Sequence, residues 1–303
     1  MSSLATFVIP NMNQIQVTSM TMRFPLLLLV IFALFLTACG DVKRSGGSSP
    51  EMLQQNVLQE VTARKVIRVG VMPNTQPFSY QVGSTWTGFD IEIAHGVANH
   101  LGIDKVEFVP VSLDQRSDAV INGTVDMVVA SMTITRYRER RVDFSIPYFQ
   151  DGMALLVKSS SPINSYIDLD KKTIGSTKGS TSSFYMKQIN PDAVVKTYAD
   201  NAALRSALDA GEVDAITSDY ITLVGMVANA KDPASLRIAG SRLTVEPFGI
   251  AVAPNQSAWR NAINHALIAL WEKQDWHASA DTWFGPSSKY ASPINFVMPV
   301  YPK

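Results

Sequence analysis

The feature that most constrains the fold of this chain is an alternation along the sequence. Short β-branched runs alternate with helical segments of about ten residues. The run VIRVGV at residues 66–71 is followed by a helical segment at 91–101. A second run lies at 106–111, and Ser112 is placed to cap a helical segment that reaches Asn122. This alternation is typical of right-handed βαβ units, so we expect an α/β fold with a parallel sheet.

The same order returns in the second half of the chain. After a strand at 153–158, a new series begins at residues 172–175, and Gly179-Ser180-Thr181 is placed to start a helix. A strand at 194–198 and a helical segment at 201–210 follow. The chain therefore predicts two units of the same kind.

A short internal repeat supports two similar lobes. Gly123-Thr-Val-Asp126, an apolar run and Ser131 return as Gly211-Glu-Val-Asp214, an apolar run and Ser218-Asp219. When the glycines are aligned, Ser131 and Asp219 occupy the same place at the ends of two equivalent strands. Each lobe should then present polar groups at a strand end.

Hydroxyl groups and arginines follow the apolar run Met127–Ala130. Ser131, Thr133 and Thr135 come where the strand ends, and Arg138 lies about one helical turn further on. Ligands of open α/β sheets bind beyond the carboxyl ends of the strands, and the planar guanidinium can bind both oxygens of a carboxylate. The stretch predicts a carboxylate receptor with Arg138 at its centre.

The neighbouring arginines have a simpler interpretation. Arg136, Arg140 and Arg141 are typical of a solvated helical turn. A nucleic-acid surface is not indicated, because Lys+Arg and Asp+Glu both total 26 and no basic stripe accompanies the cluster.

An apolar run near the start resembles a bacterial lipoprotein signal. Residues 24–37 are nearly all apolar, follow Arg23 and lead into the sequence LTAC, which ends at Cys39. The run is too short to span a bilayer as a helix, and small residues before Cys39 suit a cleavage site. Cys39 is the only cysteine, so we expect it to be lipidated. Nothing before Met20 resembles a signal, which leaves Met20 or Met22 as alternative starts.

Three segments carry a resemblance to a known family. They are GFDIEIA at 88–94, NGTVDMVVASMTITRYR at 122–138 and VDFSIPYFQDG at 142–152. From residue 66 to about 285 the chain resembles the amino-acid-binding proteins of ABC importers, the family 3 solute-binding proteins. The resemblance implies a periplasmic-binding-protein-like (type II) α/β fold, with two α/β lobes joined by two crossing strands and the ligand cleft between them.

The resemblance also implies a domain organisation. The expected parts are a lipoprotein signal peptide at 1–39, a flexible tether at 40–59, lobe 1 at 60–152 and 248–288, lobe 2 at 153–247, and a C-terminal tail at 289–303 with no assigned place.

In this family an arginine at the position of Arg138 binds the ligand α-carboxylate. Groups matching Ser131 and Thr133 assist it, and Ser180 and Thr181 match contacts from lobe 2 to the same carboxylate. The residues agree with this role, since Ser180 and Thr181 open a helix whose N–H groups and dipole favour an anion.

Asp219 matches the carboxylate that pairs with the ligand α-ammonium. Its alternative role is an N-cap for a helix that includes Ile221. Thr75 and Leu113 stand where members that bind basic amino acids or glutamine often place aromatic rings, which argues against such ligands.

Arg116 is the candidate for side-chain recognition. It shares a helix face with Leu113 and Val120, and the pair Gln115-Arg116 resembles the site at which glutamate- and aspartate-binding members hold the distal carboxylate. In this interpretation Arg116 is a buried cation without a partner until that carboxylate arrives. The alternative is an arginine on an exposed helix.

We therefore expect an extracytoplasmic, lipid-anchored, monomeric substrate-binding component of an ABC amino-acid importer, which binds glutamate or aspartate and docks on a permease. The alternatives are a binder of glutamine or asparagine, or a periplasmic dehydratase or sensory protein on the same fold. No enzyme, cofactor or metal is indicated, because the four histidines are scattered and neither H-E-x-x-H nor Gly-x-Ser-x-Gly occurs.

Overall fold

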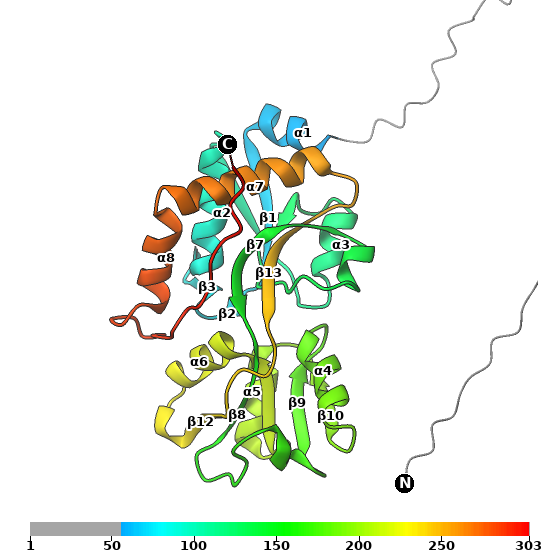
Figure 1. The fold of residues 1–303 in the computed structure, drawn as a ribbon, viewed down its shortest axis with the longest axis vertical. Helices are drawn as coiled ribbons and strands as arrows, with labels where there is room; N and C mark the ends of the chain where they lie inside the picture. Colours follow the sequence, from blue (N-terminus) through cyan, green and yellow to red (C-terminus); the bar gives the residue numbers. More distant parts are fainter. Residues whose placement is uncertain (1–55, 303) are drawn as a thin grey trace, which may run out of the picture. The chain divides into compact units, whose positions relative to one another are not determined.

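The computed structural model describes residues 56–302, which belong to one compact unit of the chain (Figure 1). The signal at 1–39, Cys39 and most of the tether at 40–59 lie outside the described residues. Among residues 56–302, no helix is long and apolar enough to cross a membrane.

The first sheet has five strands in the order β5-β1-β6-β13-β7. Their bounds are β1 Val66–Val71, β5 Lys105–Pro110, β6 Met127–Val128, β7 Asp143–Asp151 and β13 Glu246–Val252. Strand β1 pairs in parallel with both β5 and β6, while β13 runs antiparallel to β6 and β7. We call the part of the molecule built on this sheet lobe 1.

Helices cover both faces of the first sheet (Figure 1). They are α1 Val57–Arg64, α2 Phe89–His100, α3 Arg116–Ile121, α7 Ser257–Glu272 and α8 Asp275–Phe284. Met127 and Val129 pack into the core that contains α2 and α7, and Val128 and Ala130 pack into the second core with α3. Successive residues of a strand face opposite ways, so this apolar run is buried on both faces as predicted.

The second sheet repeats this plan in the order β10-β9-β11-β8-β12, and we call the part built on it lobe 2. Its elements are β8 Met153–Lys158, β9 Thr173–Thr177, α4 Thr181–Ile189, β10 Val194–Tyr198, α5 Asn201–Ala210, β11 Ala215–Asp219, α6 Tyr220–Ala228 and β12 Leu236–Ala239. Strands β9, β10 and β11 are parallel, and β8 is antiparallel to β11 and β12.

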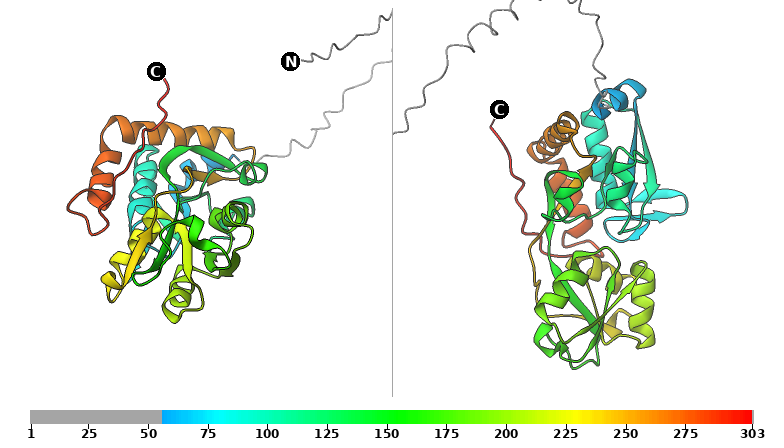
Figure 2. Two further views of the ribbon diagram at one scale, coloured as in Figure 1. Left: turned by 60° about the horizontal axis from the view of Figure 1, so that its bottom comes forward. Right: turned by 90° about the vertical axis from the view of Figure 1, so that its right-hand side faces the viewer.

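Two segments cross between the lobes, as expected from the family resemblance. Strand β7 continues through Gly152 into β8, and the chain returns from β12 into β13, which pairs with β7 from Glu246↔Asp151 to Val252↔Asp143. Figures 1 and 2 show the two crossing strands side by side. A Cβ atom on Gly152 would lie 2.1 Å from the carbonyl oxygen of Thr244, so only glycine permits this close approach.

The remaining elements lie in both lobes. A small sheet is formed by β2 Asn74–Thr75, β3 Ser79–Val82 and β4 Thr85–Thr87, and single 3-10 turns occur at η2 Arg138–Arg140, η3 Tyr166–Leu169 and η4 Pro233–Ser235. The tail after α8 had no predicted place. In the structure Met298 is buried in the core of lobe 1, with Ile294 and Phe296 packed against it.

Some predicted helix starts are wrong. The helix expected to be capped by Ser112 begins at Arg116, because the Ser112 hydroxyl donates to Asp114 and residues 112–115 form a turn. The helix predicted at 91–101 begins two residues earlier, at Phe89.

Candidate ligand-binding cleft

The internal repeat forms equivalent structures in the two lobes. The Asp126 carboxylate accepts a 2.7 Å hydrogen bond from the backbone N–H of Arg68 in β1, and Asp214 accepts a 2.8 Å bond from Thr173 in β9. Each aspartate thus fixes its own strand, β6 or β11, beside the first parallel strand of its sheet. This pairing carries the ends of β6 and β11 to corresponding places.

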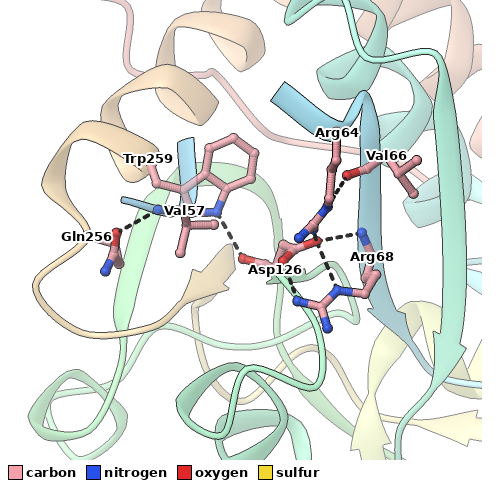
Figure 3. Close-up of polar contacts among 7 residues, drawn as sticks. All are labelled: Val57, Arg64, Val66, Arg68, Asp126, Gln256 and Trp259. Carbon is pink, nitrogen blue, oxygen red and sulfur yellow. Dashed lines mark hydrogen bonds and ion pairs between the residues drawn. The ribbon is translucent and has the colours of Figure 1, made fainter. Parts of the chain in front are cut away.

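The two aspartates differ in their further partners, and Figure 3 shows those of Asp126. Asp126 also forms ion pairs with Arg64 and with Arg68, at 2.7 Å for the latter, and its backbone oxygen accepts a hydrogen bond from the Trp259 indole. Asp214 has no ion pair among residues 56–302. Lobe 1 therefore holds its strand end more firmly than lobe 2.

Ser131 ends the lobe 1 strand in a left-handed backbone conformation, with a φ of 45°. The buried Asp90 carboxylate accepts hydrogen bonds from the Ser131 N–H at 3.0 Å, the Ser131 hydroxyl at 3.2 Å and the Tyr148 hydroxyl at 2.7 Å. Burial raises the pKa of Asp90 to about 6, against the effect of these hydrogen bonds. Non-glycine residues with such dihedrals cluster at functional sites, and here Asp90 holds the turn in place.

A small cavity of about 20 Å³ lies where the strand ends of the two lobes meet. Most of its surrounding side chains carry hydroxyl groups, together with two guanidiniums, one carboxylate and one amide: Met72, Thr75, Leu113, Arg116, Ser131, Thr133, Arg138, Thr177, Ser180, Thr181, Asn201, Ser218, Asp219 and Thr222. The structure thus brings all the candidate residues except Cys39, which lies outside the described part, to one place.

Arg138 links the two lobes at this cavity. Its guanidinium donates to the carbonyl oxygen of Thr133 in lobe 1 at 2.7 Å and to that of Gly179 in lobe 2 at 3.0 Å. Burial lowers its pKa, and the charges of Asp219 and Glu246 oppose this shift. A guanidinium so placed can turn from these carbonyls to a carboxylate, which is the stronger acceptor.

Asp219 is the acidic group of the cavity in lobe 2. It precedes α6, but its side chain forms no capping hydrogen bond, so the alternative role as an N-cap side chain is not found. No hydrogen bond or ion pair to its carboxylate occurs within the described part of the chain. Burial raises its pKa well above the ordinary value, as do the charges of Glu246 and Asp151, and Arg116 and Arg138 oppose them.

Arg116 is buried, with 2% of its surface exposed, so the interpretation as a surface arginine is wrong. Its guanidinium donates to the backbone oxygens of Leu113 at 3.0 Å, Ala130 at 2.8 Å and Ser131 at 3.3 Å. The prediction of a buried cation without a partner is therefore wrong as well. Burial lowers the pKa of Arg116 to about 9, with a further contribution from Arg138.

Glu246 connects the hydroxyl groups of both lobes and was missed in the sequence. The carboxylate is 1% exposed and lies at the start of β13. It accepts hydrogen bonds from the hydroxyls of Thr133 at 2.7 Å, Thr181 at 2.6 Å and Thr244 at 2.8 Å. No motif marks Glu246. The only signal was its position beside the predicted crossing strand.

Ser180 acts at the start of α4 as the sequence suggested. Its hydroxyl accepts the N–H of Ser183 at 3.4 Å, and it also lies 2.9 Å from the hydroxyl of Ser176. Helix α4 therefore begins at the cavity, and the N–H groups of a first helical turn can bind an anion there.

The lobes also touch on either side of the cavity. Lys178 forms a 2.8 Å ion pair with Asp114, and the amide of Asn201 donates to the Thr75 hydroxyl at 3.3 Å. In α6, a Cβ on Gly225 would lie 2.1 Å from the backbone oxygen of Gln76. The lobes are thus closed on one another around a set of opposite charges.

Comparison with known proteins agrees with this arrangement. Residues 67–286 match the model of the bacterial extracellular solute-binding proteins, family 3. The chain is 36% identical over 249 residues to the ABC transporter glutamine-binding protein GlnH of Bacillus subtilis (strain 168), which covers 80% of this chain and 90% of that protein. It is 36% identical over 217 residues to the glutamine-binding protein of Geobacillus stearothermophilus, and this match covers 70% of this chain and 82% of that protein.

Among solved structures, an ancestral arginine-binding protein bound to glutamine superposes with a TM-score of 0.70 at 35% identity, over 73% of this chain and 99% of that one. The residues that match the family model, 67–286, contain the crossing strands, every residue around the cavity and all of both sheets except Val66. The chain belongs to family 3 of the bacterial extracellular solute-binding proteins.

Proposed function

We propose that this protein binds a polar neutral amino acid, glutamine in the first place, between its lobes and delivers it to the permease of an ABC importer. The observation that carries the proposal is the cavity with the Arg138 guanidinium on lobe 1 and the Asp219 carboxylate on lobe 2. These charges complement the α-carboxylate and α-ammonium of an amino acid. The glutamine-binding relatives support the choice of ligand. This choice goes against the expectation that Thr75 and Leu113 exclude glutamine.

The surroundings of Arg116 favour a neutral side chain over the predicted glutamate or aspartate. Three backbone oxygens already accept hydrogen bonds from its guanidinium, so a distal carboxylate would have to compete with them. The other groups at the cavity, such as Thr75, Asn201 and Ser218, are neutral and both donate and accept. A carboxamide also donates and accepts, so these groups suit it better than a second negative charge.

Calorimetric titration with the twenty amino acids tests the ligand. Glutamine should bind at least tenfold more tightly than glutamate, because burying an unpaired carboxylate costs more than burying a hydrogen-bonded amide. Tighter binding of glutamate would restore the acidic-ligand interpretation. Absence of binding for every α-amino acid would overturn the proposal.

Arg116→Gln separates the two interpretations of the buried arginine. We expect the variant to lower the melting temperature and to weaken glutamine and glutamate by similar factors, since Arg116 supports the strand end through Ala130 and Ser131. A selective loss of glutamate affinity would show instead that Arg116 recognises a distal carboxylate.

The anchoring part of the proposal rests on the sequence LTAC. A lipid on Cys39 would anchor the protein to the membrane, and the residues between Cys39 and the start of α1 at Val57 would serve as the tether. The two lobes would then be held beside the extracytoplasmic side of the permease. Cys39→Ser should abolish incorporation of labelled fatty acid and leave amino-acid binding unchanged. Label that persists in this variant would contradict the anchor.

A further inference from the structure

The hydroxyl groups of two threonines from opposite lobes donate hydrogen bonds to the same carboxylate oxygen. Thr133 of lobe 1 and Thr181 of lobe 2 both donate to Oε2 of Glu246, at 2.7 and 2.6 Å. Thr244 donates to the other oxygen, Oε1, at 2.8 Å. Glu246 itself lies on the crossing strand β13 behind the cavity, and the two threonines line the cavity.

This arrangement determines what the two hydroxyls can offer a ligand. A threonine hydroxyl has one proton and two lone pairs. When this proton is in a hydrogen bond to Glu246, only the lone pairs of the hydroxyl oxygen are free to interact with a ligand in the cavity. The hydroxyls of Thr133 and Thr181 can then accept from an N–H group but cannot donate to a carboxylate.

We propose that Glu246 is a positioning residue that turns Thr133 and Thr181 into hydrogen-bond acceptors for the ligand's ammonium group, beside Asp219. The inference rests on the proposed amino-acid site. It reassigns the two hydroxyls, for which the family resemblance implied contacts to the α-carboxylate. The carboxylate is left to Arg138 and to the N–H groups at the start of α4. The ammonium group has three protons, and Asp219 with the two threonines supplies three acceptors.

The neighbouring Asp151 provides a matched control for a purely structural role. It is the cross-strand partner of Glu246 and is also buried, at 2% exposed. Its carboxylate pairs with Arg242 at 2.8 Å and accepts the N–H of Ile221 at 2.8 Å. Neither partner lines the cavity, so Asp151→Asn should disturb the same strand pair without changing the two hydroxyls.

The test is a double-mutant cycle read by glutamine titration. Glu246→Met keeps a side chain of similar length, but it removes both carboxylate oxygens and so leaves no acceptor for the two threonine hydroxyls. We expect a loss of affinity of about 10- to 100-fold, corresponding to the loss of two ordinary hydrogen bonds. In the Thr133→Val/Thr181→Val background, the same substitution should cost less than about threefold, because it acts through the missing hydroxyls.

Two controls accompany the cycle. In the Thr133→Ser/Thr181→Ser background the hydroxyls remain, so Glu246→Met should keep its full effect. Asp151→Asn should have the same effect in the wild-type and valine backgrounds. A thermal melt checks that the double valine variant folds. If it does not fold, separate double-mutant cycles with Thr133→Val and with Thr181→Val give the same information.

A ligand analogue tests the direction of the hydrogen bonds. The probe is glutaramate, which is glutamine without its α-ammonium group, measured by competition with labelled glutamine. The valine substitutions should weaken glutamine about tenfold or more and leave glutaramate unchanged within about threefold.

The outcomes separate this inference from the proposed function. If the wild-type protein binds no amino acid, the proposed function fails. The role given to Glu246 is overturned if glutamine binds but Glu246→Met lowers the affinity by the same factor in every background. It is also overturned if the valine substitutions weaken glutaramate as much as glutamine.

Discussion

The two lobes share one strand order but differ in how they are packed. Lobe 1 has an aromatic core in which Phe78, Phe89 and Phe149 contact one another, with ring centroids 5.3–6.4 Å apart. The buried residues of the two cores of lobe 2 are aliphatic side chains and methionines. The strand order alone is therefore enough to place polar groups at equivalent strand ends, whatever fills the core behind them.

The lobes also divide the charges of the site. Lobe 1 supplies Arg116 and Arg138, and lobe 2 supplies Asp219. Neither lobe alone presents charged side chains of both signs at the cavity. In our account a ligand with both charges is held only when the lobes come together, and this dependence can be tested from each side.

The largest effect should come from removing either charge. Arg138→Ala and Asp219→Ala should each weaken glutamine by about 30- to several-thousand-fold, because each leaves one ligand charge buried without a partner. Arg136→Ala, on the exposed part of the same loop, is the control and should stay within about threefold. Binding within threefold of the wild type for either site variant would remove that residue from the site. Calorimetry measures all three.

The repeated aspartates should differ in their contribution to stability. Asp126→Ala should lower the free energy of unfolding by about 3 kcal/mol, since it leaves Arg64 and Arg68 and a backbone N–H without their buried acceptor. Asp214→Ala should cost about 1 kcal/mol, because its carboxylate is exposed and accepts from one strand N–H. Urea unfolding compares them. Equal losses of unfolding free energy in the two variants would mean that the ion pairs with Arg64 and Arg68 do not stabilise lobe 1.

Closure itself can be blocked from lobe 2. Gly225→Ala places a methyl group 2.1 Å from the backbone oxygen of Gln76 in lobe 1, which cannot be relieved by a side-chain rotation. We expect glutamine affinity to fall about 30-fold, with little change in stability because alanine favours the helix. Gly96→Ala is the control, since its methyl group meets only the Leu270 side chain within lobe 1. Wild-type affinity in Gly225→Ala would show that binding does not need this contact.

Acid should weaken binding through lobe 2. The raised pKa of Asp219 means that its carboxyl holds a proton at pH values where an ordinary aspartate is ionised. The ligand ammonium favours the ionised form, so binding must release this proton. Affinity should fall as the pH drops below the raised pKa, by at most about tenfold per pH unit, and level off above it. Titrations from pH 4 to 8 should show this slope in the wild type and a flat, weak profile in Asp219→Asn. A flat wild-type profile would contradict the role of Asp219.

Features that depend on local sequence were predicted well. The strands at 66–71, 153–158 and 194–198 and the helix at 201–210 have the predicted bounds, because their periodicity and flanking residues act within each segment. The repeat also placed Ser131 and Asp219 correctly at one cavity, since equivalent strands end at equivalent places.

Features that depend on distant backbone could not be predicted. The partners of Arg116 are carbonyl oxygens whose direction is set by the turn at Ser131, and that turn depends on Asp90, 41 residues away along the chain. Glu246 meets Thr133 across 113 residues. A sequence shows that an arginine or glutamate is present but not which oxygen or hydroxyl it reaches, so both roles emerged only from the structure.

Hydrogen exchange of the wild-type protein with and without glutamine tests most directly whether one ligand is held by both lobes. We predict slower exchange in two regions, at residues 131–138 of lobe 1 and at residues 180–183 and 219–222 of lobe 2. The lobe 2 amides should change most, because Asp214 lacks the ion pairs with which Asp126 fixes the strand end of lobe 1. Arg138→Ala should lose the protection in both lobes together. Protection confined to one lobe, or lost in only one lobe in this variant, would contradict the account.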